Sequence, residues 1–114
     1  MINNDFKCPC CNVACMDPNF QTQLYRAEKH SGIPFTINSG FRCPAHNKEI
    51  GGSPTSSHLK GLAADISATN SWERYYVLSA LISAGFTRIG IAKTYIHVDA
   101  DAAKPGPVVW LYNA

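Results

Sequence analysis

The hydrophobic positions in residues 19–30 recur at the spacing of an amphipathic helix. Asp17 can cap the start of this helix, and Pro18 suits its first turn, where the missing N–H costs nothing. Gly32, followed two residues later by a proline, is typical of a helix end. We therefore predict a helix that begins near Pro18. Its apolar face consists of Phe20, Leu24 and Ala27.

A second helix is predicted over residues 71–84, where apolar side chains again recur at helical spacing. Asn70 can cap its first turn together with Glu73 three residues on, and Gly85 can close its last turn. We expect this helix to pack against the core through one apolar surface. That surface consists of Trp72, Tyr75, Leu78, Leu81 and Ile82.

Five short segments rich in β-branched, aromatic and alternating residues are typical of strands. Only Lys93 and Thr94 separate the third segment from the fourth, so a hairpin is the simplest connection between them. Two helices beside a small, mostly antiparallel sheet indicate an α+β fold. The predicted strands are residues 35–38, 62–67, 88–92, 95–99 and 108–112.

Length and composition indicate one small globular domain that covers residues 1–114. Hydrophobic residues make up 46% of the chain and charged residues 16%, which suits a packed core rather than disorder. Residues 1–16 are expected to form an irregular, cysteine-bearing arm. A net charge of +2 without a run of lysine or arginine argues against a nucleic-acid partner. We expect a monomer.

The sequence has no apolar run long enough to form a membrane-spanning segment. Its start, residues 1–5, lacks the basic and apolar regions of a signal peptide. The chain is therefore expected to be made in the cytoplasm without a signal peptide.

Five cysteines leave two interpretations open. Cys8 and Cys11 have the C-x2-C spacing of a structural zinc knuckle, and Cys43 with His46 has C-x2-H spacing. The adjacent pair of Cys10 and Cys11 fits such paired ligand sets poorly. Free thiols in a reducing cytosol are the alternative.

Two histidines and one aspartate form a candidate ligand set for a catalytic metal. His58 ends a long connection that starts at residue 41, and Asp65 lies in an apolar predicted strand. Burying a carboxylate in such surroundings is costly unless it is paired, hydrogen-bonded or metal-bound. His97 lies in another predicted strand. Two imidazoles and one carboxylate can hold zinc and leave a fourth position open for water.

Three sequence blocks together resemble a known family of enzymes. They are residues 39–47 (S-G-F-R-C-P-A-H-N), residues 51–65 (G-G-S-P-T-S-S-H-L-K-G-L-A-A-D) and residues 95–99 (Y-I-H-V-D). In this order they resemble the zinc peptidases of bacterial cell walls, the D-Ala-D-Ala carboxypeptidase and L-alanyl-D-glutamate endopeptidase group. This group shares its fold with the hedgehog signalling domain. The resemblance extends over residues 6–112.

The resemblance implies a role for several residues. The family's zinc ligands correspond to His58, Asp65 and His97. An arginine that holds a substrate carboxylate corresponds to Arg42, whose planar guanidinium suits that group. A serine that helps to position the substrate corresponds to Ser56. Three aromatic residues fit either a cleft or, more commonly, the core: Phe41, Tyr95 and Trp110.

The chain departs from the family pattern at one catalytic position. Many relatives carry an acidic residue three positions before the last histidine ligand, and this chain has Thr94 there. Asp99 is the nearest acidic replacement and is expected to share a strand face with His97. It is predicted either as the catalytic general base or as a group that orients the imidazole of His97. Both roles stay open at this point.

The function that the resemblance implies is zinc-dependent hydrolysis of peptide bonds in bacterial peptidoglycan. Metal-activated water would be the nucleophile. The expected absence of a signal peptide and of a wall-binding module favours a phage or prophage lytic enzyme, which acts after release or from a virion. The alternative is a non-catalytic zinc-binding module on the same fold, as the hedgehog relationship suggests.

Overall fold

The computed structural model describes residues 6–112 of the chain. The first five residues, in which no signal sequence was expected, and the start of the predicted arm lie outside this range. The long connection after residue 41 contains a short helix and a 3-10 helix, labelled α2 and η2. In chain order the elements are α1 (Pro18–Ser31), β1 (Ile37–Ser39), α2 (Pro44–Glu49), η2 (Ser57–Lys60), β2 (Ala63–Ser67), α3 (Ser71–Ser83), β3 (Arg88–Ile91), β4 (Tyr95–Asp99) and β5 (Val108–Leu111).

The five strands form one sheet in the order β1-β2-β4-β3-β5. All neighbouring pairs are antiparallel except β3 and β5, which are parallel. The α+β class with a mostly antiparallel sheet is therefore confirmed. The predicted hairpin is also confirmed, since β3 and β4 pair directly and the Ala92 N–H donates to the Tyr95 carbonyl at 3.0 Å.

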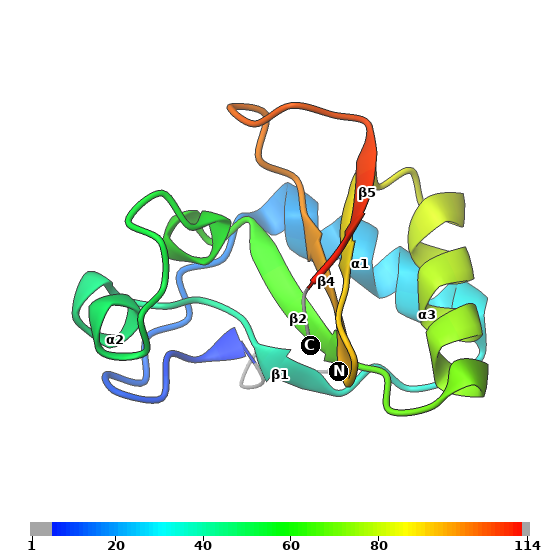
Figure 1. The fold of residues 1–114 in the computed structure, drawn as a ribbon, viewed down its shortest axis with the longest axis horizontal. Coiled ribbons are helices and arrows are strands. Elements are labelled where there is room, and N and C mark those ends of the chain that lie inside the picture. The colour runs from blue at the N-terminus through cyan, green and yellow to red at the C-terminus, as the bar shows by residue number, and fades with distance from the viewer. Residues whose placement is uncertain (1–5, 113–114) are drawn as a thin grey trace.

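Helices α1 and α3 cover one face of the sheet (Figure 1). The predicted cap of α1 is present: the Asp17 side chain accepts from the Phe20 N–H at 2.9 Å, and Gly32 ends the helix in a left-handed conformation. Because side chains alternate along each strand, only one face of β2 and β4 contributes to this core. The main buried contributors are Phe20, Leu24, Ala27, Ala64, Ile66, Val77, Ala80, Leu81, Ile89, Ile96 and Val98.

The predicted apolar surface of α3 is partly wrong. Trp72, Tyr75 and Ile82 are 59%, 66% and 55% exposed; Leu81 is buried, as predicted, and the helix buries the smaller Val77 and Ala80 beside it. The smaller buried side chains allow α3 to pack closely, so the large aromatic residues remain on the outer surface. Leu78 is partly buried against the core, as predicted.

The opposite face of β2 and β4 is not covered by α1 or α3 and carries polar residues. Asp65 on β2 lies directly across from His97 on β4 in the strand register. Figure 1 shows that α2 and η2 lie together on the far side of the strands from α3. Within residues 6–112, no helix has both the length and the apolar character required to cross a membrane.

Candidate metal centre

The predicted ligands His58, Asp65 and His97 lie together. One potential ligand atom from each side chain lies within 4.8 Å of the other two, and all three residues are buried. The pairing of β2 with β4 brings Asp65 and His97 together, and η2 adds His58 from the long connection. The two imidazole rings are 5.3 Å apart, in an edge-on arrangement.

Of the two ring nitrogens of His58, one forms a hydrogen bond to the backbone, and the other has no hydrogen-bond partner among the described residues. Its Nδ1 lies 2.7 Å from the carbonyl oxygen of Gly40 and therefore carries the proton that it donates there. Nε2 consequently has a free lone pair. This atom is buried, lies 3.4 Å from Asp65 Oδ1, and has no hydrogen-bond partner among the described residues.

The unpartnered nitrogen shows that these residues fit a metal ion. A buried nitrogen lone pair without a hydrogen bond loses its interaction with water and gains nothing in return. A cation between His58 Nε2, Asp65 and His97 Nδ1 would satisfy all three groups, since neutral imidazole and carboxylate are usual zinc ligands. The donor set leaves a position open, as catalytic sites require.

His97 is held between two carboxylates. Its Nδ1 lies 2.9 Å from Asp65 Oδ1, and its Nε2 lies 2.8 Å from Asp99 Oδ2. Burial alone would lower the pKa of His97, but these two hydrogen bonds outweigh burial and raise it. Burial likewise opposes ionisation of Asp65, yet the hydrogen bond from His97 Nδ1 helps to hold the pKa of Asp65 below its usual range.

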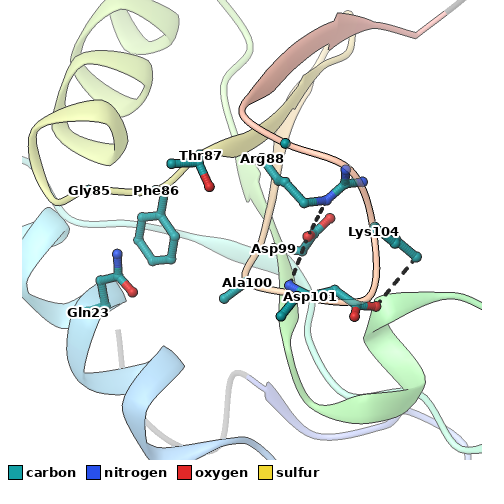
Figure 2. Close-up of a pocket in the computed structure, with 11 residues that line it drawn as sticks. Gln23, Gly85, Phe86, Thr87, Arg88, Asp99, Ala100, Asp101 and Lys104 are labelled. Atoms are coloured by element: carbon teal, nitrogen blue, oxygen red, sulfur yellow. Dashed lines mark hydrogen bonds and ion pairs between the residues drawn. The ribbon is translucent and has the colours of Figure 1, made fainter.

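Asp99 contacts His97, and both of its carboxylate oxygens already accept hydrogen bonds. Arg88 Nε donates to Asp99 Oδ1 at 2.8 Å, and the backbone N–H of Asp101 donates to the same oxygen at 3.2 Å. Figure 2 shows Arg88 and Asp99 joined beside the pair of Lys104 and Asp101, around a cavity of about 340 Å³. Burial disfavours the charge of Asp99, but His97 and the other donors lower its pKa. These contacts favour the role of orienting His97.

Arg42 lies beside Asp65. Its Nη2 is 3.6 Å from Asp65 Oδ2, and its other nitrogens donate to Ser39 Oγ and Asn47 Oδ1, both at 3.3 Å. The side chain is 15% exposed, so part of the guanidinium faces the cavity above the site. Asn47 was not predicted as a site residue, because its role depends on α2 turning back toward Arg42.

Ser56 caps η2 and also lines the cavity. Its Oγ accepts from the backbone N–H of His58 at 3.3 Å. Gly61, in a left-handed conformation with φ +69°, ends η2 and lets the chain continue directly into β2. The predicted contact of Ser56 with substrate stays a prediction.

The ligand group opens into a cavity of about 460 Å³. Tyr95 and Trp110 line this cavity, so for these two residues the cleft interpretation holds rather than the core interpretation. Tyr112 and Lys104 also line it and were not predicted, because Tyr112 follows β5, which lies beside β3, and Lys104 lies in the connection between β4 and β5. Burial, helped by the negative charge of Asp65, raises the pKa of Tyr95.

The absence of a side chain at Gly90 makes room for Trp110 and Tyr112, which we call the aromatic wall of the cavity. Gly90 on β3 lies across from His97 on β4 and beside Trp110 on β5. A Cβ atom at Gly90 would lie 2.6 Å from ring atoms of both Trp110 and Tyr112. The glycine therefore allows the Trp110 ring to approach His97, with 5.6 Å between the ring centres.

The α+β fold carries a buried group of potential metal ligands that opens into a cavity, and sequence comparison identifies the family. The profile of the family Peptidase M15 matches residues 3–99. Since the match covers most of the chain, the protein belongs to the Peptidase M15 family, whose members are zinc peptidases of the D-Ala-D-Ala carboxypeptidase type. The expected family is thereby confirmed. No match was found among curated protein sequences.

Proposed function

We propose that this protein is a zinc-dependent peptidase that hydrolyses peptide bonds of bacterial peptidoglycan. The zinc ligands in this proposal are His58 through Nε2, Asp65 through its carboxylate, and His97 through Nδ1. The observation that carries the proposal is the buried, unpartnered Nε2 of His58, which lies 3.4 Å from Asp65 Oδ1. Membership of the Peptidase M15 family supports the peptidase activity.

Zinc, when bound, supplies Lewis-acid activation of water and of a peptide carbonyl. Arg42, Arg88 and Lys104 give the cavity three cationic groups, while peptidoglycan peptides carry carboxylates. The guanidinium of Arg42 can hold a carboxylate through two parallel hydrogen bonds. We therefore assign Arg42 to substrate binding, with Ser56 beside it at the start of η2.

Tyr95 is assigned as a hydrogen-bond donor to the substrate. Its raised pKa keeps the phenol protonated at neutral pH, so it can donate but cannot act as a base. Tyr112, whose pKa burial also raises, lines the same cavity. Such donors stabilise the negative charge that develops on a carbonyl oxygen during hydrolysis.

Asp99 is assigned as a positioning residue. By accepting from His97 Nε2–H, it directs the lone pair of Nδ1 toward Asp65, where the metal would lie. The general-base role remains the competing prediction. A general base needs a carboxylate oxygen that can take a proton from water within the cavity. A positioning residue needs only the hydrogen bond to His97.

A non-catalytic zinc-binding domain is the second candidate, and one observation favours it. Among the described residues, Asp65 and Asp99 are the only carboxylates that line the cavity, and both are already engaged. Thr94, at the position where many relatives have an acidic residue, lies in the turn between β3 and β4. A hedgehog-like binding role on this fold would need no general base.

Digestion of purified peptidoglycan distinguishes the two candidates. The zinc-loaded protein is expected to release new amino groups, and mass spectrometry of the fragments identifies the bond that is cut. Chelation should abolish the release, and added zinc should restore it. His30→Ala, at an exposed histidine, is a matched control for His58→Ala. Full zinc occupancy without any released amines at high protein concentration would contradict the peptidase proposal and support the binding domain.

The biological setting is a separate proposal. We propose that the enzyme is a phage or prophage lytic enzyme that is made in the cytoplasm and reaches the wall after release or from a virion. Co-expression with a pore-forming holin should then be needed for lysis from within. Lysis by the enzyme alone at the same expression level would contradict this route.

A further inference from the structure

A second cluster of potential metal ligands lies at the N-terminal arm and does not belong to the peptidase site. The sulfur atoms of Cys8, Cys10, Cys11 and Cys43 all lie within 4.8 Å of one another. Cys43 Sγ is 3.2 Å from Cys10 Sγ and 3.6 Å from Cys8 Sγ. Zinc–sulfur bonds of about 2.3 Å place tetrahedral ligands about 3.8 Å apart. The observed separations are close to that value and longer than the ~2.05 Å of a disulfide bond.

We propose that these four thiolates, from Cys8, Cys10, Cys11 and Cys43, bind a structural zinc ion. Four protein ligands fill a tetrahedral site and leave no open position for water or substrate, which is the arrangement of structural rather than catalytic zinc. The C-x2-C spacing of Cys8 and Cys11 is part of this cluster, and the adjacent Cys10 joins it. Cys15 is exposed and lies outside it.

His46 supports the cluster through its backbone rather than through its ring. Its N–H donates to Cys43 Sγ at 3.4 Å, while the N–H of Cys43 donates to Cys8 Sγ at the same distance. Backbone donors of this kind stabilise the negative charge of thiolate ligands and fix their orientation. The interpretation of Cys43 and His46 as a C-x2-H ligand pair is therefore replaced by thiolate ligation alone.

The surrounding fold brings the arm to Cys43. Phe6 is fully buried, and its carbonyl accepts from the Phe41 N–H at 2.9 Å. A Cβ at Gly40 would lie 2.6 Å from the Cα of Phe6, so the arm crosses the chain at a position that requires glycine. The Cys8 N–H donates to the Val13 carbonyl at 2.8 Å and closes the loop that carries the first three thiols.

The proposed ion would tie the arm to the segment that carries the substrate-binding arginine. Cys43 directly follows Arg42 in the chain, and Arg42 lies beside Asp65 in the peptidase site. The thiolate site thus stabilises one wall of the cavity. It does not depend on the proposed peptidase activity, because its ligands and its measurement are separate from those of the histidine site.

Zinc content by mass spectrometry of the purified chain tests the proposal. The wild type is expected to bind about two zinc ions, and Cys10→Ser with Cys11→Ser about one. Cys15→Ser is the matched control and should keep both ions. His58→Ala should lose only the histidine-site ion, and after cobalt substitution it should still show a strong thiolate-to-cobalt charge-transfer band.

A second measurement uses no cysteine variants, because a variant that fails to fold would lose zinc for that reason alone. In the His58→Ala protein, titration with an organomercurial that blocks thiols should release the remaining zinc in proportion to the thiols blocked. A His58→Ala protein that is folded and zinc-free would overturn the proposal. So would an intact mass lower by one pair of hydrogen atoms in reducing buffer, since that mass would reveal a disulfide in place of the metal.

Discussion

The two groups of potential metal ligands are held by very different parts of the molecule. Asp65 and His97 lie on paired strands whose register fixes their separation, and η2 supplies His58 from a capped turn. The four thiols instead lie mainly on an arm without strands or long helices, held by Phe6 and a few backbone hydrogen bonds. The fold thus forms the first group in advance, whereas the second group depends more on the ion that it binds.

This difference matches the two roles proposed for the sites, catalysis at the histidine site and stabilisation of the fold at the thiolate site. A site with an open position needs ligands that keep their geometry when water or substrate exchanges, and regular strand pairing provides that stability. A closed thiolate site contributes the free energy of metal binding to folding, so it can order a segment that is otherwise weakly packed. The following experiments are ordered by the size of their expected effect on one region or the other.

Loss of a ligand at the histidine site should have the largest effect. His58→Ala should abolish zinc binding there and lower kcat/KM by about a thousandfold or more, since the metal contributes several kcal/mol to transition-state stabilisation. Zinc content and peptidoglycan hydrolysis are measured on the same sample. His30→Ala should behave as wild type. A His58→Ala protein with full metal content at this site would show that the ligand assignment is wrong.

The Asp99→Asn substitution distinguishes the two roles of this residue. If Asp99 orients His97, zinc affinity should fall by about 10- to 100-fold, and activity should recover when zinc is raised. If Asp99 is instead the general base, zinc affinity should be unchanged and kcat should remain low at saturating zinc. Measuring zinc affinity and kcat together therefore separates the positioning role from the catalytic role.

Chelation should affect the two regions differently. Hydrogen exchange at the amides of Phe41 and Cys43 should accelerate by at least about tenfold when metal is removed, because the arm then opens locally. The ladder between β2 and β4 should keep its protection. Equal acceleration in both regions would contradict the idea that the sheet holds its ligands in advance.

The aromatic wall can be disturbed through Gly90. Gly90→Ala should cost about 1–3 kcal/mol of unfolding free energy, since the new methyl group overlaps the rings of Trp110 and Tyr112. The double variant with Trp110→Ala should recover part of this loss. Urea unfolding of the single and double variants measures the coupling, and strictly additive effects would rule out the proposed overlap.

An effect no larger than that of Gly90→Ala is expected at Asp101, whose carboxylate accepts from Ser57 Oγ and Lys60 Nζ, both at 2.9 Å. Burial opposes its charge, but these donors lower its pKa below the ordinary value. Its ionised form therefore stabilises the fold above the ordinary pKa, and this contribution is lost as pH falls through the lowered pKa.

Asp101→Asn should reduce the unfolding free energy by about 1–3 kcal/mol at neutral pH, and the difference should shrink below about pH 4. Glu49→Gln on the exposed surface of α2 is the control, and it should change little at any pH. A difference that is constant with pH would show that the charge of Asp101 is not responsible.

Much of the fold and the ligand set could be predicted from sequence. The caps at Asp17 and Asn70 and the alternation in β2 and β4 are local signals, so they give the elements and the faces on which Asp65 and His97 lie. The exposure of Trp72 could not be predicted in this way. Helical spacing identifies an apolar stripe but does not say which part of it meets the sheet.

The details of the site depend on contacts between distant segments. Tyr112 reaches the cavity because β5 lies parallel to β3, a strand order that no local pattern specifies. The contact of His97 Nε2 with Asp99 is local by contrast, since the two residues lie two positions apart on β4 and share a face of the strand. The thiol cluster was left open because the adjacency of Cys10 and Cys11 obscured it, although the fold brings both to Cys43.

The central claim is that His58, Asp65 and His97 hold zinc, and anomalous diffraction at the zinc absorption edge tests it most directly. Crystals of the zinc-loaded protein should show a peak about 2.0–2.2 Å from His58 Nε2, from His97 Nδ1 and from an Asp65 oxygen. His97 Nε2 should remain bonded to Asp99. A zinc-loaded crystal without a peak between these three side chains, or with zinc on Nε2 of His97, would contradict the account.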